Sequence, residues 1–304
     1  MAVISVLNNK GGVGKTTISY NLGAAISLHE NMRYTKVLLV DLDPQQNLSS
    51  LLHITKSKKP HIADYFQDSK KRITELSAEQ LRENLWAIPG SHDLSVIDAE
   101  MSVAIHENPA CARDVVECLA EKINKARNVF HFIIIDCGPA EGNLMYNALQ
   151  ASDAYIVPIN SKMSLSGMEN LRRIIQANLF DKDELREYPL LSNVDKEAAY
   201  TEQLDDFMQR YPNRLQTIIT HHRCLDNANN DEKTIYDYPL ASFQGKWFKS
   251  AREEFDSLAT EILEIFGGWG DEMKQPYETI PYISLEHEDD EDRPKKGFFS
   301  RWFG

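Results

Sequence analysis

The chain has 304 residues, of which 42% are hydrophobic and 26% are charged, as is typical of a folded globular protein. It has no apolar run long enough to span a bilayer, and Met1 leads directly into an apolar segment. We therefore expect no transmembrane helix, no signal peptide and a cytoplasmic location. The formal net charge of −13 repels phosphate backbones on average, so nucleic-acid binding would need a local basic patch. The four cysteines form no CxxC pair, which favours reduced structural thiols over a metal cluster.

A glycine-rich loop follows the first predicted strand, residues 3–7, which is apolar and rich in β-branched residues. The loop reads Asn8-Asn9-Lys10-Gly11-Gly12-Val13-Gly14-Lys15-Thr16-Thr17, and helical apolar spacing begins at Ile18. This order is typical of a phosphate-binding loop, because glycines let backbone N–H groups turn inward and the helix start adds unpaired donors. In such a loop Lys15 reaches the β- and γ-phosphates of ATP, and the Thr16 hydroxyl binds Mg²⁺. The alternative is a glycine-rich turn in which the lysine has no such role.

The loop also contains a second lysine, Lys10, and it has Asn9 where an ordinary phosphate-binding loop has glycine. In this respect it resembles the deviant Walker A motif of the ParA/MinD family of ATPases. The resemblance implies an ATP-dependent homodimer, in which Lys10 reaches across the interface to the partner's nucleotide and acts in catalysis together with Lys15. The residues that would bind the nucleotide here are Gly11, Gly12, Val13, Gly14, Lys15, Thr16 and Thr17.

A second apolar segment, residues 36–41, is predicted to be a buried parallel strand. It runs into Asp41-Leu42-Asp43-Pro44-Gln45-Gln46-Asn47, and acidic residues at the carboxyl end of a strand lie where open α/β sheets bind ligands. The stretch resembles the second signature of the ParA family, which implies that Asp43 positions the attacking water and that Asp41 supports the Mg²⁺ shell. Gln46 replaces a glycine of that signature, and we expect it to stiffen the loop. A solvated acidic turn is the alternative.

The strongest predicted strand, residues 130–135, ends in Asp136. An apolar strand closed by an aspartate is the Walker B pattern, in which the acid holds the Mg²⁺ shell, usually through a water molecule. In the ParA family two prolines commonly follow at this point; Gly138 replaces the first of them, so we expect a more mobile loop. Cys137 is assigned to packing.

The remaining pattern alternates strands and helices, with a polar and irregular stretch at residues 53–84. Further strands are predicted at 85–88, 154–158, 189–194 and 215–220, and further helices at 109–126, 164–177 and 246–266. The alternation predicts a doubly wound, mostly parallel sheet with helices on both faces, the P-loop NTPase fold, in one domain over residues 1–268. The family resemblance implies that Asn193, at the end of a strand, reads the adenine edge; an asparagine that caps the next helix is the alternative.

The C-terminal segment differs from the body. Residues 269–293 are acidic and aperiodic, which predicts a flexible linker, and residues 294–304 have the pattern of an amphipathic helix lying on an anionic membrane. Its basic and aromatic residues are Lys295, Lys296, Phe298, Phe299, Arg301, Trp302 and Phe303. The segment resembles the C-terminal membrane-targeting sequence of MinD proteins. Docking of this end on the protein's own surface or on a partner is the alternative.

These features predict a dimerising ATPase that hydrolyses ATP with Mg²⁺, binds the inner face of the cell membrane reversibly and positions a cargo with the help of an activating or cargo protein. The runner-up is a partition ATPase that binds nucleoid DNA without sequence preference, through basic residues such as Arg223, Lys246, Lys249 and Arg252. A metal-cluster carrier or reductase on the same fold is the third hypothesis, which the lack of a CxxC pair disfavours. A scaffold that binds nucleotide without hydrolysing it is a further alternative.

Overall fold

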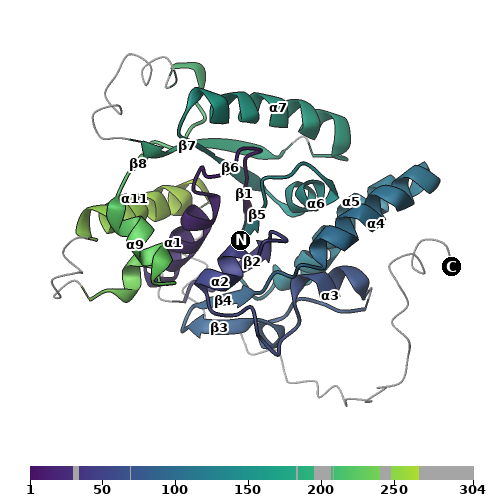
Figure 1. Ribbon diagram of the computed structural model, residues 1–304, viewed down its shortest axis with the longest axis horizontal. Helices are drawn as coiled ribbons and strands as arrows, with labels where there is room; N and C mark the ends of the chain where they lie inside the picture. The colour runs from purple at the N-terminus through teal and green to yellow at the C-terminus, as the bar shows by residue number, and fades with distance from the viewer. Residues whose placement is uncertain are drawn as a thin grey trace.

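A computed structural model describes residues 1–29, 34–68, 70–182, 184–194, 207, 209–239 and 248–266. An eight-stranded sheet runs through its centre in the order β3-β4-β2-β5-β1-β6-β7-β8 (Figure 1). The strands are β1 (Ala2–Val6), β2 (Val37–Leu42), β3 (Glu79–Arg82), β4 (Leu85–Ile88), β5 (Phe132–Cys137), β6 (Ala154–Ile159), β7 (Arg186–Val194) and β8 (Ile219–Thr220). All neighbours pair in parallel except β3 and β4. The predicted mostly parallel, doubly wound sheet is confirmed.

The apolar segments form the centre of this sheet because they are covered on both faces. In β1, β2, β4, β5 and β6 every residue is buried. The register pairs Val6 of β1 and Asp41 of β2 with Asp136 of β5. Three strands therefore end at one level, and two aspartates lie there side by side.

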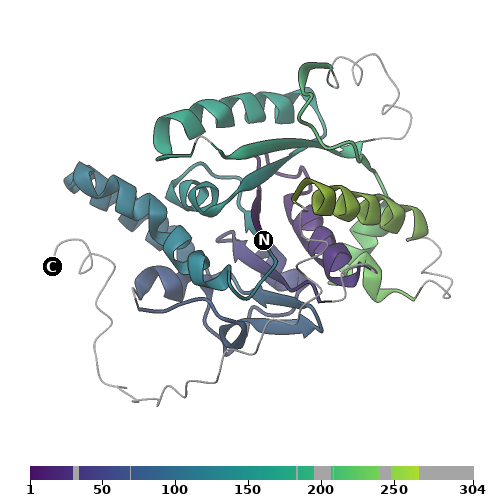
Figure 2. The ribbon, with the colours of Figure 1, turned by 180° about the vertical axis from the view of Figure 1, so that it is seen from behind.

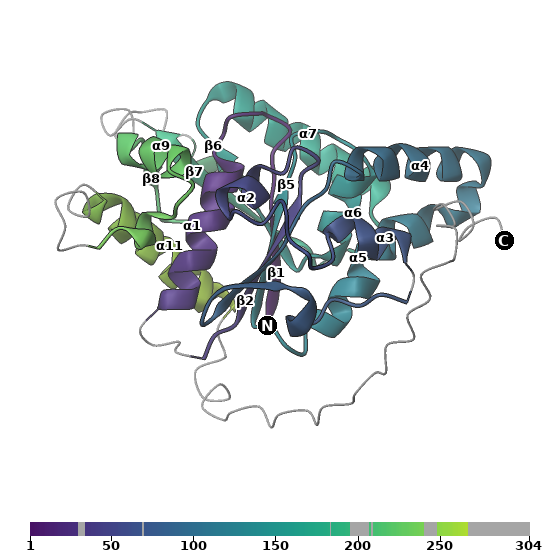
Figure 3. The same ribbon diagram turned by 60° about the horizontal axis from the view of Figure 1, so that its bottom comes forward.

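Helices cover both faces of the sheet (Figures 1 and 2). One face packs against α1 (Lys15–Leu28), α9 (Arg223–Asn230) and α11 (Lys249–Phe266). The other packs against α3 (Ile62–Gln67), α4 (Leu94–Glu107), α5 (Ala112–Ala126), α6 (Asn143–Ala151) and α7 (Lys162–Asn178). The short α2 (Asn47–Leu51) and the 3₁₀ turns η1 (Glu75–Ser77), η2 (Pro109–Cys111) and η4 (Ile235–Asp237) complete the described elements. Figure 3 shows α2, α9 and the start of α1 at the same edge of the sheet.

Helix α1 lies unusually close to the sheet at Gly23. A Cβ atom at this position would come within 2.6 Å of Leu39 Cδ2 on β2. Only glycine allows this approach without moving the leucine, and the close packing fixes the helix whose first turn carries Lys15 and Thr16.

Two of the predictions need correction. Residues 53–84 are only partly irregular, since α3 buries Ile62, Tyr65 and Phe66 and β3 adds an antiparallel edge strand. The strand predicted at 215–220 is limited to the two residues of β8. The predicted linker and membrane-targeting segment, residues 269–304, lie outside the described residues. Within the described part of the chain, no helix has the length and apolar character needed to cross a membrane.

Candidate active site

The glycine-rich loop joins β1 to α1 and holds Lys15 inside it. Gly12 and Gly14 have φ values of 72° and 86°, a left-handed conformation that favours glycine. The buried Lys15 Nζ donates hydrogen bonds to the backbone carbonyls of Asn8, at 3.1 Å, and of Lys10, at 3.0 Å. Burial lowers the pKa of Lys15, and the charge of nearby acids offsets part of this. The ammonium group is thus fixed in position, with one of its three N–H donors left for a phosphate oxygen among the described contacts.

Two buried aspartates end the strands next to this loop. Burial raises the pKa of Asp136 to about 8, and the charge of Asp41 adds to the effect. Burial also raises the pKa of Asp41 to about 6, against the hydrogen bonds that it accepts. Its Oδ2 accepts from Ser49 N and Oγ at 2.8 and 2.5 Å, and its Oδ1 accepts from Asp43 N at 3.1 Å. Two carboxyls whose ionisation is disfavoured in this way would be stabilised as anions by a nearby cation.

The oxygens of Asp136 fit a hydrated Mg²⁺. Oδ1 accepts a hydrogen bond from Ser19 Oγ at 2.9 Å, whereas Oδ2 is buried and has no hydrogen-bond partner among the described residues. The Thr16 hydroxyl is close enough to lower the pKa of Asp136. The described residues contain no group of three or more His, Cys, Asp or Glu side chains arranged as metal ligands, so phosphate oxygens and water would complete the shell. Mg²⁺ accepts such a shell because it keeps most of its water.

Asp43 lies at the opening of the same site, in the loop between β2 and α2. Its Oδ1 accepts from Gln45 N at 2.9 Å and its Oδ2 accepts from Asn47 Nδ2 at 3.1 Å. Only 5% of the residue is exposed. Two donors from its own loop therefore hold the carboxylate in one orientation.

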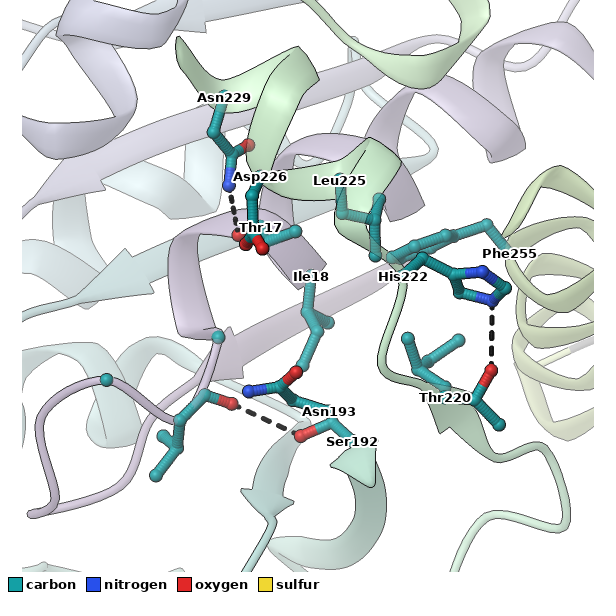
Figure 4. Close-up of a pocket in the computed structure, with 14 residues that line it drawn as sticks. Thr17, Ile18, Ser192, Asn193, Thr220, His222, Leu225, Asp226, Asn229 and Phe255 are labelled. Atoms are coloured by element: carbon teal, nitrogen blue, oxygen red, sulfur yellow. Dashed lines mark hydrogen bonds between the residues drawn. The ribbon is translucent and has the colours of Figure 1, made fainter. Parts of the chain in front are cut away.

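The glycine-rich loop borders two pockets. One, of about 530 Å³, is lined by Lys15, Thr16 and Asp43, together with residues of α2 and α9. The other, of about 230 Å³, is lined by the loop and by residues of β7, β8 and α9, including Asn193 (Figure 4). Asn193 Oδ1 lies 2.7 Å from the Nδ1 of His221, which leaves the amide N–H₂ to donate. The first pocket suits a phosphate chain and the second a planar base.

Strained backbone also gathers around these pockets. Four of the five described non-glycine residues with positive φ lie in or beside their linings: Gln46, His53, Asn193 and Glu232. His53 and Glu232 form an ion pair of 2.8 Å, which joins the end of α2 to the end of α9. Such conformations cost free energy and cluster at functional sites.

Comparisons with known proteins agree with this geometry. A family model described as an AAA domain matches residues 1–185. The sporulation initiation inhibitor protein Soj of Bacillus subtilis is 32% identical over 243 residues, which cover 78% of this chain and 90% of Soj. The chromosome partitioning protein ParA of Caulobacter vibrioides is 30% identical over 261 residues, or 83% of this chain and 93% of ParA. The chain belongs to the ParA/MinD family of ATPases.

Solved structures show the same fold at lower identity. An ATP complex of a McdA variant from Cyanothece has a TM-score of 0.68 and 18% identity, and covers 86% of this chain and 96% of its own. Cobyrinic acid a,c-diamide synthase from Mycobacterium smegmatis, with bound ADP and magnesium, has a TM-score of 0.64 and 22% identity, and covers 92% of this chain and 99% of its own.

The two departures from the ParA/MinD family pattern have a structural counterpart in this chain. Gln46 adopts φ 56° and ψ 35° immediately before α2. This left-handed conformation strains the backbone of a glutamine, whereas the glycine of the usual signature would adopt it without strain. Gly138 lies against the loop that carries Asp43, since a Cβ atom there would be 3.1 Å from Asp43 Oδ1. A side chain at position 138 would therefore require the Asp43 carboxylate or its loop to shift by a few tenths of an ångström.

Three site residues were not identified from the sequence. Ser19 holds Asp136; it lies four residues after Lys15, a spacing that places it on the same face of α1 and could have indicated it. Glu141 Oε1 accepts from Asn9 Nδ2 at 2.5 Å and from Asn170 Nδ2 at 2.7 Å, and so joins the glycine-rich loop to α7. Asn229 of α9 donates to Thr17 Oγ1 at 3.0 Å. No local pattern indicates the last two contacts, because their partners are distant in sequence.

Proposed function

We propose that the protein is an ATP-hydrolysing switch whose active site is completed by a second copy of the chain. The observation that carries this proposal is the different environment of two lysines in one loop. Lys15 is buried and points inward, whereas Lys10 is exposed at the loop's outer surface. A cation in that position is free to reach a nucleotide held by a facing copy, as the family resemblance implies.

The residues suit phosphoryl transfer to water. The N–H groups of residues 11–17 and Lys15 would hold the β- and γ-phosphates. Mg²⁺ would be held by Thr16 with Asp136 behind it and Asp41 in support, and it would neutralise charge on the phosphate oxygens. Asp43, fixed by two hydrogen bonds from its own loop, would orient the attacking water in line with the leaving group. Catalysis of this kind rests on positioning and on electrostatic stabilisation, to which Lys10 of the second copy would add a positive charge.

Dimerisation would control attachment to the membrane. Residues 294–304 carry four aromatic side chains beside basic ones, and one copy of such a short segment binds weakly and reversibly. Two copies on one dimer raise the avidity by about 10²–10⁴ if both insert. ATP binding would then favour the attached state and hydrolysis the released state. A relative named as a chromosome partitioning protein supports a role in placing a cargo, with a cargo or activating protein as partner.

The lysine pair provides the first test. Lys15→Ala should abolish binding of a fluorescent ATP analogue with Mg²⁺. Lys10→Ala should retain binding but lose phosphate release and the dimer seen by light scattering with a slowly hydrolysed analogue. Lys56→Ala, which changes another exposed lysine, is the matched control and should behave as wild type. Wild-type hydrolysis by Lys10→Ala would contradict the proposal.

Binding to nonspecific DNA is the second candidate, favoured by the names of the chromosome-partitioning relatives. Among the basic residues considered for it, Arg223 and Lys249 are exposed. Arg252 instead donates to the backbone carbonyls of Ile235 and Tyr238, and Lys246 lies outside the described residues.

Co-sedimentation with anionic liposomes and with DNA, each with ADP and with a slowly hydrolysed ATP analogue, separates the two candidates. The membrane proposal expects analogue-dependent sedimentation with liposomes, lost when residues 294–304 are deleted, while nucleotide binding is retained. Sedimentation with DNA alone, unaffected by the deletion and steeply dependent on salt, would replace it with the second candidate.

A further inference from the structure

Asn229 of α9 has an amide group that is only half used. Its Nδ2 donates to Thr17 Oγ1 at 3.0 Å, and its Oδ1 is buried without a hydrogen-bond partner among the described residues. A buried carbonyl oxygen with no donor is costly, so its presence beside a ligand pocket indicates a donor supplied by the ligand.

The position of Asn229 identifies the part of the ligand that it faces. It is one of the few residues that line both pockets, the one beside Lys15 and Thr16 and the one beside Asn193. In a nucleoside triphosphate the sugar joins the phosphate chain to the base. A residue at the junction of a phosphate pocket and a base pocket therefore lies next to the sugar.

A second acceptor lies one helical turn earlier. Asp226 also lines the base pocket, and the spacing of three residues places it on the same face of α9 as Asn229. Figure 4 shows both side chains together with Thr17 at one end of this pocket. A carboxylate and an amide oxygen on one helix face present two acceptors, and the hydroxyls of a ribose are two adjacent donors.

We infer that α9 reads the sugar of the bound nucleotide: Asn229 Oδ1 and the Asp226 carboxylate accept hydrogen bonds from the ribose hydroxyls and select ribonucleotides over deoxyribonucleotides. This inference rests on the proposed binding of ATP. Because Asn229 also holds Thr17, the same side chain ties recognition of the sugar to the first turn of α1.

A deoxynucleotide lacks one of the hydroxyl groups that would donate a hydrogen bond to these acceptors, and this difference produces the selectivity. A site built to accept a hydroxyl hydrogen bond keeps an unpaired buried acceptor when the hydroxyl is missing, and discrimination by such sites is strong. For one hydrogen bond of this kind we expect ATP to bind about tenfold more tightly than the analogue that lacks the hydroxyl.

The experiment measures the affinity of the full-length protein for ATP, 2′-deoxy-ATP and 3′-deoxy-ATP, by displacement of a fluorescent ATP analogue in the presence of Mg²⁺. The wild type should bind 2′-deoxy-ATP and 3′-deoxy-ATP each about tenfold more weakly than ATP. Asn229→Ala should reduce one of these ratios towards one, and Asp226→Ala should reduce the ratio for the other hydroxyl. Asn227→Ala, an exposed asparagine on the same helix that lines neither pocket, should keep both ratios.

The ratio distinguishes recognition of the sugar from structural support. If Asn229 only held Thr17, its substitution would weaken ATP and the deoxy analogues equally, and that result would overturn the inference. Equal binding of all three nucleotides by the wild type would also overturn it while leaving the proposed ATPase intact. Failure of the wild type to bind any of them would instead refute the proposed function itself.

Discussion

Replacing Asp136 by asparagine should change how the stability of the nucleotide-free protein depends on pH. In the unfolded chain this carboxyl titrates near its ordinary value of 3.8, whereas burial and the charge of Asp41 raise its pKa to about 8 in the folded protein. Between these two values the folded state binds a proton that the unfolded state has lost. The free energy of unfolding must therefore fall as pH rises through this window.

The magnitude follows from linkage. A difference of one bound proton between the folded and unfolded states changes the free energy of unfolding by about 1.4 kcal/mol per pH unit. Asp136 is fully buried, so solvent screening does not reduce this effect. An asparagine side chain has nearly the same shape as aspartate and carries no charge. We therefore expect the stability of Asp136→Asn, relative to wild type, to rise by about 1 kcal/mol for each pH unit between pH 6 and 8. Below pH 6 the raised pKa of Asp41 adds a slope that both proteins share.

Urea unfolding with EDTA and no nucleotide, at pH 5.5, 6.5, 7.5 and 8.5, measures this difference. The control is Asp114→Asn, which removes an exposed carboxyl on α5 and should track the wild type at every pH. Parallel pH profiles for wild type and Asp136→Asn would show that folding does not raise the pKa of Asp136, and would refute this reasoning.

Three further substitutions test the packing around the site. Gly138→Ala should lower kcat without loss of ATP binding in a phosphate-release assay, because its Cβ would be 3.1 Å from Asp43 Oδ1; an unchanged kcat would contradict the close approach. Gln46→Gly should be about 1 kcal/mol more stable than Gln46→Ala in urea unfolding, since only glycine is unstrained at φ 56°; equal stabilities would contradict this. Gly23→Ala should destabilise the fold by about 1–3 kcal/mol through contact with Leu39, and a neutral effect would mean that the leucine moves aside freely.

The central part of the fold could be predicted because its signals are local. In the predicted strand 130–135, the four consecutive apolar residues 132–135 are best accommodated by a strand that is buried on both faces of a sheet. The glycine-rich loop carries its phosphate-binding geometry within ten residues. These segments became β5 and the loop between β1 and α1, with Lys15 and Asp136 at the same edge of the sheet.

The parts that escaped prediction depend on distant contacts. Helix α9 has the sequence Arg-Cys-Leu-Asp-Asn-Ala-Asn-Asn, whose asparagines favour turns over helices. It is helical because Cys224, Leu225 and Ala228 pack on the sheet, which no local pattern reveals. Helix α9 lines the proposed nucleotide site, and Asn229 joins it to Thr17. These two residues are more than 200 positions apart in the sequence.

The raised pKa values of Asp41 and Asp136 also predict how Mg²⁺ affects the stability of the protein when nucleotide is bound. An ion that favours their charged forms stabilises the folded protein beyond the stabilisation that nucleotide alone provides. Mg²⁺ with ATP should therefore raise the unfolding temperature more than ATP with EDTA. In Asp136→Asn that difference should shrink, while Asp114→Asn should preserve it. Differential scanning fluorimetry of the three proteins measures both quantities. If magnesium added no stability to the wild type, Asp136 Oδ2 would not face the metal ion. Of the residues assigned to the ion, Thr16 alone would then have to hold it.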